Sequence, residues 1–250
     1  MPAQVTDAIV LHAFDYLETS RILRLVTRES GVQSVLARGA RRSVRRFGAA
    51  LDLFVSGTAE LQVRQGRDLQ QLTAFDVTNA RSALSLDLDR FTSASMLCEL
   101  ALRCSAGDDQ GGLFEALSDA LDVVARSEGS GAREAGLGAA WRVTAALGFA
   151  PAVDQCARCH QAIDPEAAAL FSHAVGGAAC ATCATQVRLG RQLPGDARRA
   201  LRQWLVGGEV ALGSDASRRA HVRLLREFVM HHVAEGAELR AFRAWEARFA

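Results

Sequence analysis

Four of the six cysteines form one pattern, two Cys-x2-Cys pairs separated by twenty residues, and this pattern constrains the fold more than any other feature. The pairs are Cys156 with Cys159 and Cys180 with Cys183. Two residues between thiolates let both sulfur atoms of a turn face one tetrahedral ion at about 2.3 Å. Two such turns complete the coordination. The sequence therefore predicts one zinc ion held by these four cysteines.

Two other uses of paired cysteines are weaker alternatives. Disulfides are rare in the reducing cytoplasm, and the N-terminus carries Asp7 where a secretory signal would be positive, so we expect a cytoplasmic chain. Redox catalysis uses a single Cys-x-x-Cys in a βαβ context, which is absent here. His160 and His173 lie close enough in sequence to replace one cysteine ligand. Four thiolates leave no open coordination position, so we predict a structural ion.

The cations are all arginine, 29 of them with no lysine, and they are unevenly distributed. Residues 81–155 hold 6 arginines and 11 acidic residues, whereas residues 188–226 hold 9 and 3. The formal net charge of +1 therefore hides an acidic middle and two basic zones. Hydrophobic residues at 49% and charged residues at 23% exclude wholesale disorder.

The first basic zone is residues 38–46, which carry five arginines and no acidic residue. The arginines are Arg38, Arg41, Arg42, Arg45 and Arg46. Such a cluster repels itself unless it is fully solvated or meets an anionic partner. A phosphodiester backbone supplies regularly spaced anions, and release of its counterions makes binding salt-dependent. The zone is therefore a candidate DNA contact, with an acidic protein or simple solvation as the alternatives.

The second basic zone is residues 188–226. Arg198 and Arg202 lie four apart, and Arg219, Arg223 and Arg226 follow helical spacing with apolar residues between them. A basic stripe beside an apolar face fits DNA, or an acidic peptide that ends in hydrophobic residues. The alternative is that the stripe pairs with the acidic middle inside the fold.

The predicted secondary structure changes character near residue 80. Residues 1–80 contain short β-branched or alternating runs separated by turn signals, which predict a small β-barrel. These runs are AIVLHAF, RILRLVT, VQSVLA, LFVSGTAELQVR and DLQQLTAFDV. Beyond them, helical spacing predicts helices from a cap at Ser82 through 104, over 113–126 and 133–148, and over 195–206 and 216–234. We expect Leu86 and Phe91 on the apolar face of the first helix, and Cys98 and Cys104 in the core.

The predicted fold class is therefore α+β: a barrel domain over 1–80 and a helical domain over 81–250, with a metal-binding insert at 154–186. The longest uncharged stretch, 167–187, holds Ser172, His173 and two cysteines, so we expect no membrane span.

Enzymatic signatures are missing: there is no nucleophile elbow, Walker loop, His-Glu-x-x-His or kinase motif. A hydrolase or nuclease would need clustered carboxylates for a divalent metal. The only candidates are Asp87, Asp89, Asp108 and Asp109 in the acidic middle. Asp87 and Asp89 diverge on a helix, so we predict a protein that is not an enzyme.

The residues resemble the bacterial RecO family of DNA repair proteins. The order of runs from AIVLHAF to ALDLF carries the resemblance, most specifically Ala-Arg-Gly-Ala-Arg-Arg-Ser at 37–43 and Arg-Phe-Gly at 46–48. The cysteine knuckle inside a helical region is similar to the zinc-bearing members. Two departures stand out. Leu17 occupies a position where the family usually has glycine before the hairpin Glu18, and Val44-Arg45 replaces a Lys-Ser.

The resemblance implies an N-terminal OB-fold that binds single- and double-stranded DNA, and a helical domain with one structural zinc ion. It implies a recombination mediator that anneals strands and, with RecR, helps RecA displace single-strand-binding protein. Matching positions carry the DNA role onto Arg38, Arg41, Arg42 and Arg46, while Arg45 joins them on physical grounds only. The family also docks the C-terminal tail of single-strand-binding protein. Charge and spacing alone make Arg198, Arg202, Arg219 and Arg223 the candidates for that contact. A cytoplasmic, nucleoid-associated location follows. The alternative is a zinc-stapled, non-enzymatic module that binds an acidic protein.

Overall fold

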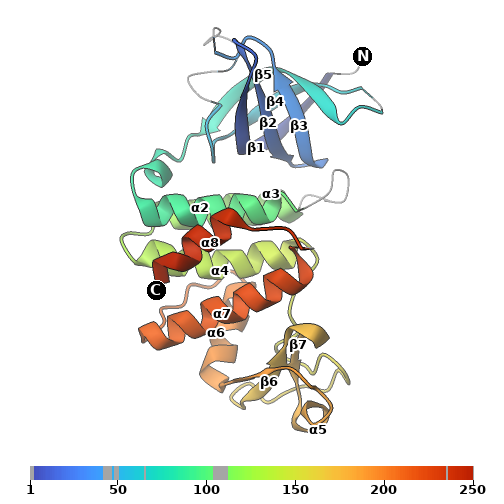
Figure 1. Cartoon of the computed structure of the whole chain (residues 1–250), viewed down its shortest axis with the longest axis vertical. Helices are drawn as coiled ribbons and strands as arrows, with labels where there is room; N and C mark the ends of the chain where they lie inside the picture. Colours follow the sequence, from blue (N-terminus) through green and yellow to red (C-terminus); the bar gives the residue numbers. More distant parts are fainter. Residues whose placement is uncertain are drawn as a thin grey trace.

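The computed structural model describes residues 3–41, 47, 51–64, 66–103, 112–234 and 236–249 (Figure 1). Five strands close into a barrel in the order β1-β2-β3-β5-β4. All pairs are antiparallel except β3 with β5. The strands are β1 (Ala3–Tyr16), β2 (Ser20–Thr27), β3 (Gly31–Ala37), β4 (Ser56–Gln62) and β5 (Leu69–Asn79). The prediction of an N-terminal five-stranded barrel of the OB type is confirmed.

A β-bulge divides β1 into two halves. The register of β1 with β2 shifts between Val10 and His12, and an extra residue in one strand reverses which side chains face inward. Before the shift Ala8 and Val10 lie in the barrel core, and after it Ala13 packs against that core. His12, Phe14 and Tyr16 are consequently exposed. The bulge therefore separates a half of β1 that lies over the helices from a half that projects beyond them.

Helices make up most of the rest of the chain and lie below the barrel in Figure 1. They are α2 (Leu88–Ala101), α3 (Gly112–Arg126), α4 (Gly131–Ala146), α5 (Ala181–Ala184), α6 (Gly195–Leu205), α7 (Asp215–His232) and α8 (Arg240–Glu246), with 3-10 turns η1 (Ser82–Ser85), η2 (His173–Val175) and η3 (Ala247–Phe249). In α3, Leu113, Leu117 and Leu121 recur every four residues and are buried, as an amphipathic helix requires. The predicted helical region is confirmed.

A small sheet interrupts the helices between α4 and α6. Its strands are β6 (Ala169–Ser172), β7 (Gly177–Ala179) and β8 (Arg191–Leu193), in the order β7-β6-β8. This segment, with α5, forms the knuckle at the lower end of the molecule in Figure 1. Within the described ranges, no helix combines the length and apolar character that crossing a bilayer would take.

The start of the first long helix differs from the prediction. Ser82 begins the short turn η1, and α2 begins at Leu88 with Asp87 as its cap, whose carboxylate accepts from the backbone N–H of Arg90 at 3.0 Å. Leu86 falls in the connection before α2 and is 82% exposed, so the prediction that it lies on the apolar face of the helix is wrong. Phe91 lies on α2 and, although partly exposed, its ring is 5.6 Å from that of buried Phe54. Cys98 is buried as expected, and burial raises the pKa of its thiol to about 12. Cys104 lies outside the described residues.

The outer face of the barrel and the helices share a hydrophobic cluster that is separate from the one inside the barrel. Ile9, Leu11, Val26 and Val32 of the barrel belong to the same buried cluster as the apolar faces of the helices. Arg81, buried and with a φ of 43°, donates to the carbonyl of Phe54 at 2.9 Å and to Asp122 at 2.6 Å. Its guanidinium also donates to the hydroxyl of Ser118 at 2.9 Å. A buried cation with several acceptors is thus placed between β4 and α3.

Candidate metal centre and nucleic-acid interface

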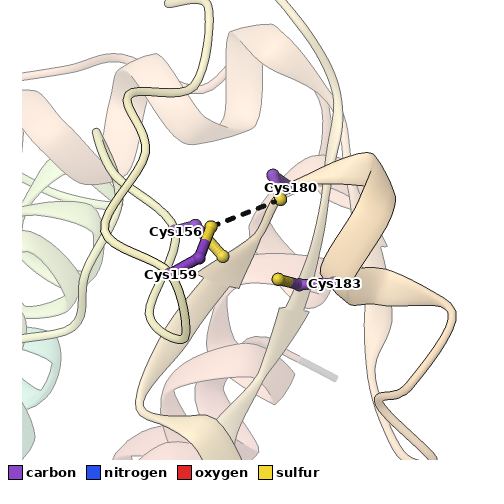
Figure 2. A group of neighbouring side chains, drawn as sticks. All are labelled: Cys156, Cys159, Cys180 and Cys183. Carbon is purple, nitrogen blue, oxygen red and sulfur yellow. Dashed lines mark hydrogen bonds between the residues drawn. The ribbon is translucent and has the colours of Figure 1, made fainter.

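The four cysteines of the two Cys-x2-Cys pairs come together in the knuckle (Figure 2). One sulfur from each lies within 4.8 Å of all the others. The Sγ atoms of Cys159 and Cys180 are 3.8 Å apart. Sulfur atoms at the corners of a tetrahedron around an ion at 2.3 Å would be about 3.8 Å apart. The donor set and its size therefore fit one tetrahedral metal ion.

Local backbone geometry holds each pair in place. The first pair lies in a tight turn in which His160 donates its N–H to the carbonyl of Cys156 at 2.9 Å and adopts a φ of 60°. Ala157 donates to the carbonyl of Ala178 on β7 at 2.8 Å, which ties this turn to the sheet. Cys180 follows β7 directly and precedes the short helix α5, which carries Cys183. Because β7 is hydrogen-bonded to the first turn and leads directly into Cys180, it brings the two pairs face to face.

The environment of the cysteines favours thiolate formation at one position. Cys156 is fully buried, and burial alone would raise its pKa. Hydrogen bonds from the backbone of Cys180, Cys159 and Arg158 and from the Cys159 side chain outweigh burial and lower the pKa of Cys156 to about 6. Hydrogen bonding to Cys159 and Cys180 raises the pKa of Cys183 to about 12. Contacts within the one cluster of thiols therefore lower the pKa of Cys156 and raise that of Cys183.

Of the five arginines in the first basic zone, two lie within the described residues. Arg38 follows β3 directly and is exposed, with no ion-pair partner in the described part of the chain. Arg41 is exposed, lies 3.8 Å from Asp15, and donates its backbone N–H to Thr19 in the β1–β2 turn at 3.1 Å. Arg42, Arg45 and Arg46 lie outside the described residues. The start of this zone thus meets the first hairpin at one end of the barrel.

Sequence periodicity missed a neighbouring group of side chains. His12, Phe14 and Tyr16 are exposed on β1 beyond the bulge, and the rings of His12 and Phe14 lie 4.4 Å apart. Arg24 on β2 pairs in register with His12 and donates to Ser34 at 3.1 Å. The bulge hid this group, because strict alternation along β1 does not continue through it. Leu17 at the hairpin turn has a φ of 53°, a conformation that favours glycine, which matches the departure noted in the sequence.

Arg198 requires a correction. We expected it on a partner-binding surface, but it is only 2% exposed. Its guanidinium donates to backbone carbonyls of the knuckle at Val153 (3.2 Å), Asp164 (3.0 Å) and Ala167. Burial lowers its pKa. With its donors engaged inside the fold, Arg198 is a structural residue that anchors the knuckle to α6.

The other candidates of the second zone divide into two kinds. Arg202 pairs with Asp154 at 3.0 Å, as the internal-pairing alternative predicts. Arg219 and Arg223 are exposed on α7 and have no ion-pair partner among the described residues. Arg226, which completes the predicted stripe, pairs with Glu246 at 3.5 Å. The unpaired part of this zone is therefore reduced to Arg219 and Arg223 on α7, with Arg188 in the loop before β8.

The carboxylates considered for a nuclease have other partners. Asp87 caps α2, and Asp89 is mostly buried between Arg133 at 3.4 Å and Arg248 at 2.6 Å. Asp108 and Asp109 lie outside the described residues. Within the described ranges, the four cysteines are the one group of metal-ligating side chains close enough to share an ion.

Comparison with known proteins covers nearly the whole chain. The family model described as Recombination protein O N terminal matches residues 1–81, and Recombination protein O C terminal matches residues 85–240. A DNA repair protein RecO from Anaeromyxobacter sp. (strain K) is 36% identical over 244 residues, covering 94% of this chain and 93% of the relative. The RecO of Nocardioides sp. is 30% identical over 241 residues, covering 94% and 97%. The RecO of Myxococcus xanthus is 31% identical over 232 residues, covering 91% of each.

Proposed function

The chain belongs to the recombination protein O family, and on that premise we propose that it is a DNA repair and recombination mediator. In this proposal the protein binds single- and double-stranded DNA, anneals complementary strands and helps load RecA onto DNA covered by single-strand-binding protein. It acts in the cytoplasm at the nucleoid and catalyses no covalent chemistry. One observation carries the DNA role: Arg38, which is exposed and has no ion-pair partner in the described part of the chain, lies at the end of a closed barrel where a segment with four further arginines begins.

Annealing follows from charge neutralisation. Two complementary strands repel each other through their phosphates, and the free energy of base pairing drives their association once that repulsion falls. Arginine forks hold phosphates without reading bases, so the activity has little sequence preference. We assign this role to Arg38, Arg41, Arg42, Arg45 and Arg46.

Partner contacts belong to the helical region in this proposal. Arg219 and Arg223 on α7 are exposed and have no ion-pair partner within the described ranges, which supports them as the contact for the acidic, hydrophobic-ended tail of single-strand-binding protein. Arg202 contributes more weakly, because Asp154 already neutralises it. RecR is the second proposed partner, and RecA is reached indirectly.

We propose zinc as the ion of the knuckle. Four thiolates in tetrahedral spacing are the donors that structural zinc prefers. Cys156, Cys159, Cys180 and Cys183 would hold it, and binding would contribute to the folding of the segment 154–186. We also propose two domains, a barrel domain over 1–80 and a helical domain over 81–250 that contains this insert.

The test is binding of a labelled, unstructured single strand across a salt series, with annealing of complementary strands measured in parallel. The variant replaces all five arginines of residues 38–46 with alanine, and Arg240→Ala/Arg243→Ala removes exposed charge from α8 as the matched control. We expect steep salt dependence and rapid annealing for the wild type and the control, and loss of both for the five-arginine variant. Circular dichroism and zinc content verify that each variant is folded.

One outcome favours the alternative function. If the wild type binds no oligonucleotide at any salt concentration, the basic zone serves an acidic protein, and the chain is a zinc-stapled interaction module. Cleavage of the labelled strand in the presence of Mg²⁺ would contradict the non-enzymatic assignment.

A further inference from the structure

Beyond the bulge, the outer face of β1, β2 and β3 presents a regular grid of side chains. The register places Phe14 opposite Ile22, and Ile22 opposite Leu36. The next row joins His12, Arg24 and Ser34. Tyr16, two residues beyond Phe14 on the same strand, pairs with Ser20. Side chains two apart on a strand point to the same side, so Phe14 and Tyr16 stand next to each other on one surface.

These two rings are exposed in a protein that buries most of its aromatic residues. Phe14 is 46% and Tyr16 43% exposed, whereas the three tryptophans and most phenylalanines are buried. Phe91 and Phe149 are also exposed, but Phe91 lies on α2 and Phe149 lies just after the end of α4. The ring of His12 packs on Phe14 at 4.4 Å with the planes tilted by 32°, which limits the rotation of the Phe14 side chain. The face thus offers two adjacent aromatic rings to solvent, and the ring of His12 packs against that of Phe14.

The cations on this face are unneutralised. Neither Arg24 nor Arg38 has an ion-pair partner among the described residues, and the Nε of Arg24 is buried without a hydrogen-bond acceptor. The nearby carboxylate of Asp15 is bound by Arg21 at 3.2 Å and lies 3.8 Å from Arg41. Stacking surfaces flanked by unpaired arginines match the two chemical parts of a single strand, its base rings and its phosphates.

We propose that successive unpaired bases of single-stranded DNA stack on Phe14 and Tyr16, while Arg24 and Arg38 bind the adjoining phosphates. The inference rests on the proposed DNA-binding function and adds a preference to it. Duplex DNA keeps its bases stacked inside the helix, so it engages the arginines but not the two rings. The face therefore distinguishes single strands from duplexes, independently of base sequence.

The test compares three probes of equal length: a thymidine oligonucleotide, an abasic oligonucleotide with the same phosphates, and a blunt duplex. Phe14→Ala, Tyr16→Ala and the double variant are measured against Val5→Ala, which trims an exposed apolar side chain at the other end of β1. We expect each ring removal to weaken thymidine-strand binding about tenfold. Affinity for the abasic strand and the duplex, and the salt slope for all three probes, should remain as in the wild type.

A gain-of-signal variant provides a second readout that does not depend on losing affinity. Tyr16 is the single tyrosine of the chain, and Trp141, Trp204 and Trp245 are buried. Tyr16→Trp therefore adds one exposed indole to a background of buried ones. We expect thymidine strands to quench its fluorescence and abasic strands to leave it unchanged, because quenching requires a base against the ring.

Failure of this inference is distinguishable from failure of the proposed function. If the double variant binds thymidine strands as tightly as the wild type and Tyr16→Trp is not quenched, stacking is wrong while phosphate binding stands. If the wild type binds none of the three probes, the DNA-binding function itself is wrong and the stacking site falls with it. Equal losses for all three probes would also overturn stacking, since abasic strands offer no rings.

Discussion

The two arginine-rich zones of this chain share one residue type but differ in charge density and in surroundings: residues 38–46 hold 5 arginines and no acidic residue, whereas residues 188–226 hold 9 arginines and 3 acidic residues. At the end of the barrel, Arg38 is exposed and has no ion-pair partner among the described residues, and Arg41 lies 3.8 Å from the carboxylate of Asp15. In residues 188–226, Arg191 pairs with Glu227 and Arg218 with Glu134, and Arg198 is buried under the knuckle. Glu134 lies 84 residues before Arg218 in the chain.

The difference shows that the charge available to a partner is set by the carboxylates that the fold brings near, and not by neighbours in sequence. The acidic middle supplies Glu134 and Asp154 to the second zone. At the barrel end, Asp15 and Asp52 pair with Arg21, and none of the described carboxylates pairs with Arg38. Exposed ion pairs stabilise a fold only slightly, so the second zone gains little stability from pairing and loses much of its capacity to attract anions.

The largest expected effect lies in the knuckle that the second zone supports. Cys156→Ser removes one of the four sulfur donors, and we expect the free energy of unfolding of the metal-loaded protein to fall by more than about 4 kcal/mol. Chemical denaturation followed by circular dichroism measures the loss, with metal content determined on the same samples. The control is Thr182→Ser, a conservative change at an exposed residue between the cysteines of the second pair. An unchanged stability together with full metal loss would mean that the ion contributes nothing to folding.

Arg198→Met is expected to have the next largest effect. It leaves several buried carbonyls of the knuckle without donors, and each such loss costs about 1–3 kcal/mol. We expect a total of about 4 kcal/mol, since neighbouring losses are not additive. Arg199→Met, which removes the adjacent exposed arginine paired with Glu166, is the matched control and should change stability by less than about 1 kcal/mol. Equal effects of the two substitutions would refute the distinction between buried and surface arginines in this zone.

His221, a buried residue of α7 in the second zone, makes the stability of the protein depend on pH. Burial lowers the pKa of His221 to about 4, although Asp196 opposes the shift. Between pH 6.5, the ordinary pKa of histidine, and pH 4, His221 is protonated in the unfolded chain but stays neutral in the folded one. Stability is therefore fully present above pH 6.5 and is lost as the pH falls towards 4, by about 3 kcal/mol. Urea denaturation at pH 7, 5 and 4 measures this loss of stability. His221→Leu should make the free energy of unfolding less dependent on pH over this range. A His221→Leu profile that falls as steeply as that of the wild type would exclude His221 as the cause.

The smallest effect on stability and the sharpest test of the comparison come from two double variants. Arg38→Ala/Arg41→Ala and Arg219→Ala/Arg223→Ala each remove two exposed charges, and each should change stability by less than about 0.5 kcal/mol. We expect only the first to weaken single-strand binding, by about tenfold, and to reduce the salt slope by about 1.4. Fluorescence anisotropy across a salt series measures both quantities. If the second pair lowers the slope as much as the first, DNA also contacts α7.

The sequence predicted those parts of the molecule that depend on local chemistry. The spacing of Cys156, Cys159, Cys180 and Cys183 was sufficient to predict a four-cysteine cluster, because two residues between thiolates set the turn by themselves. The barrel was predicted because its strands alternate or are β-branched, and the helices because their apolar residues recur at helical spacing.

Features that depend on tertiary contacts were not predictable in the same way. Arg198 has the helical spacing of a surface stripe, and only the knuckle folded against it makes it a buried donor. The aromatic face was hidden because the bulge at Val10 and His12 changes the phase of β1. Ser82 and Asp87 are both residue types that cap helices well. Ser82 begins the short turn η1, and Asp87 caps the long helix α2.

Arg81 has a consequence for how the whole chain unfolds. Its guanidinium bonds to the barrel at Phe54 and to α3 at Asp122 and Ser118, over a core that continues from β1 into the helices. Separating the barrel from the helices would expose that core and break these bonds together. We therefore expect one cooperative melting transition for both, and no hinge at residues 81–85. A strand bound at the barrel end, as proposed, would then keep a constant distance from the four-cysteine knuckle.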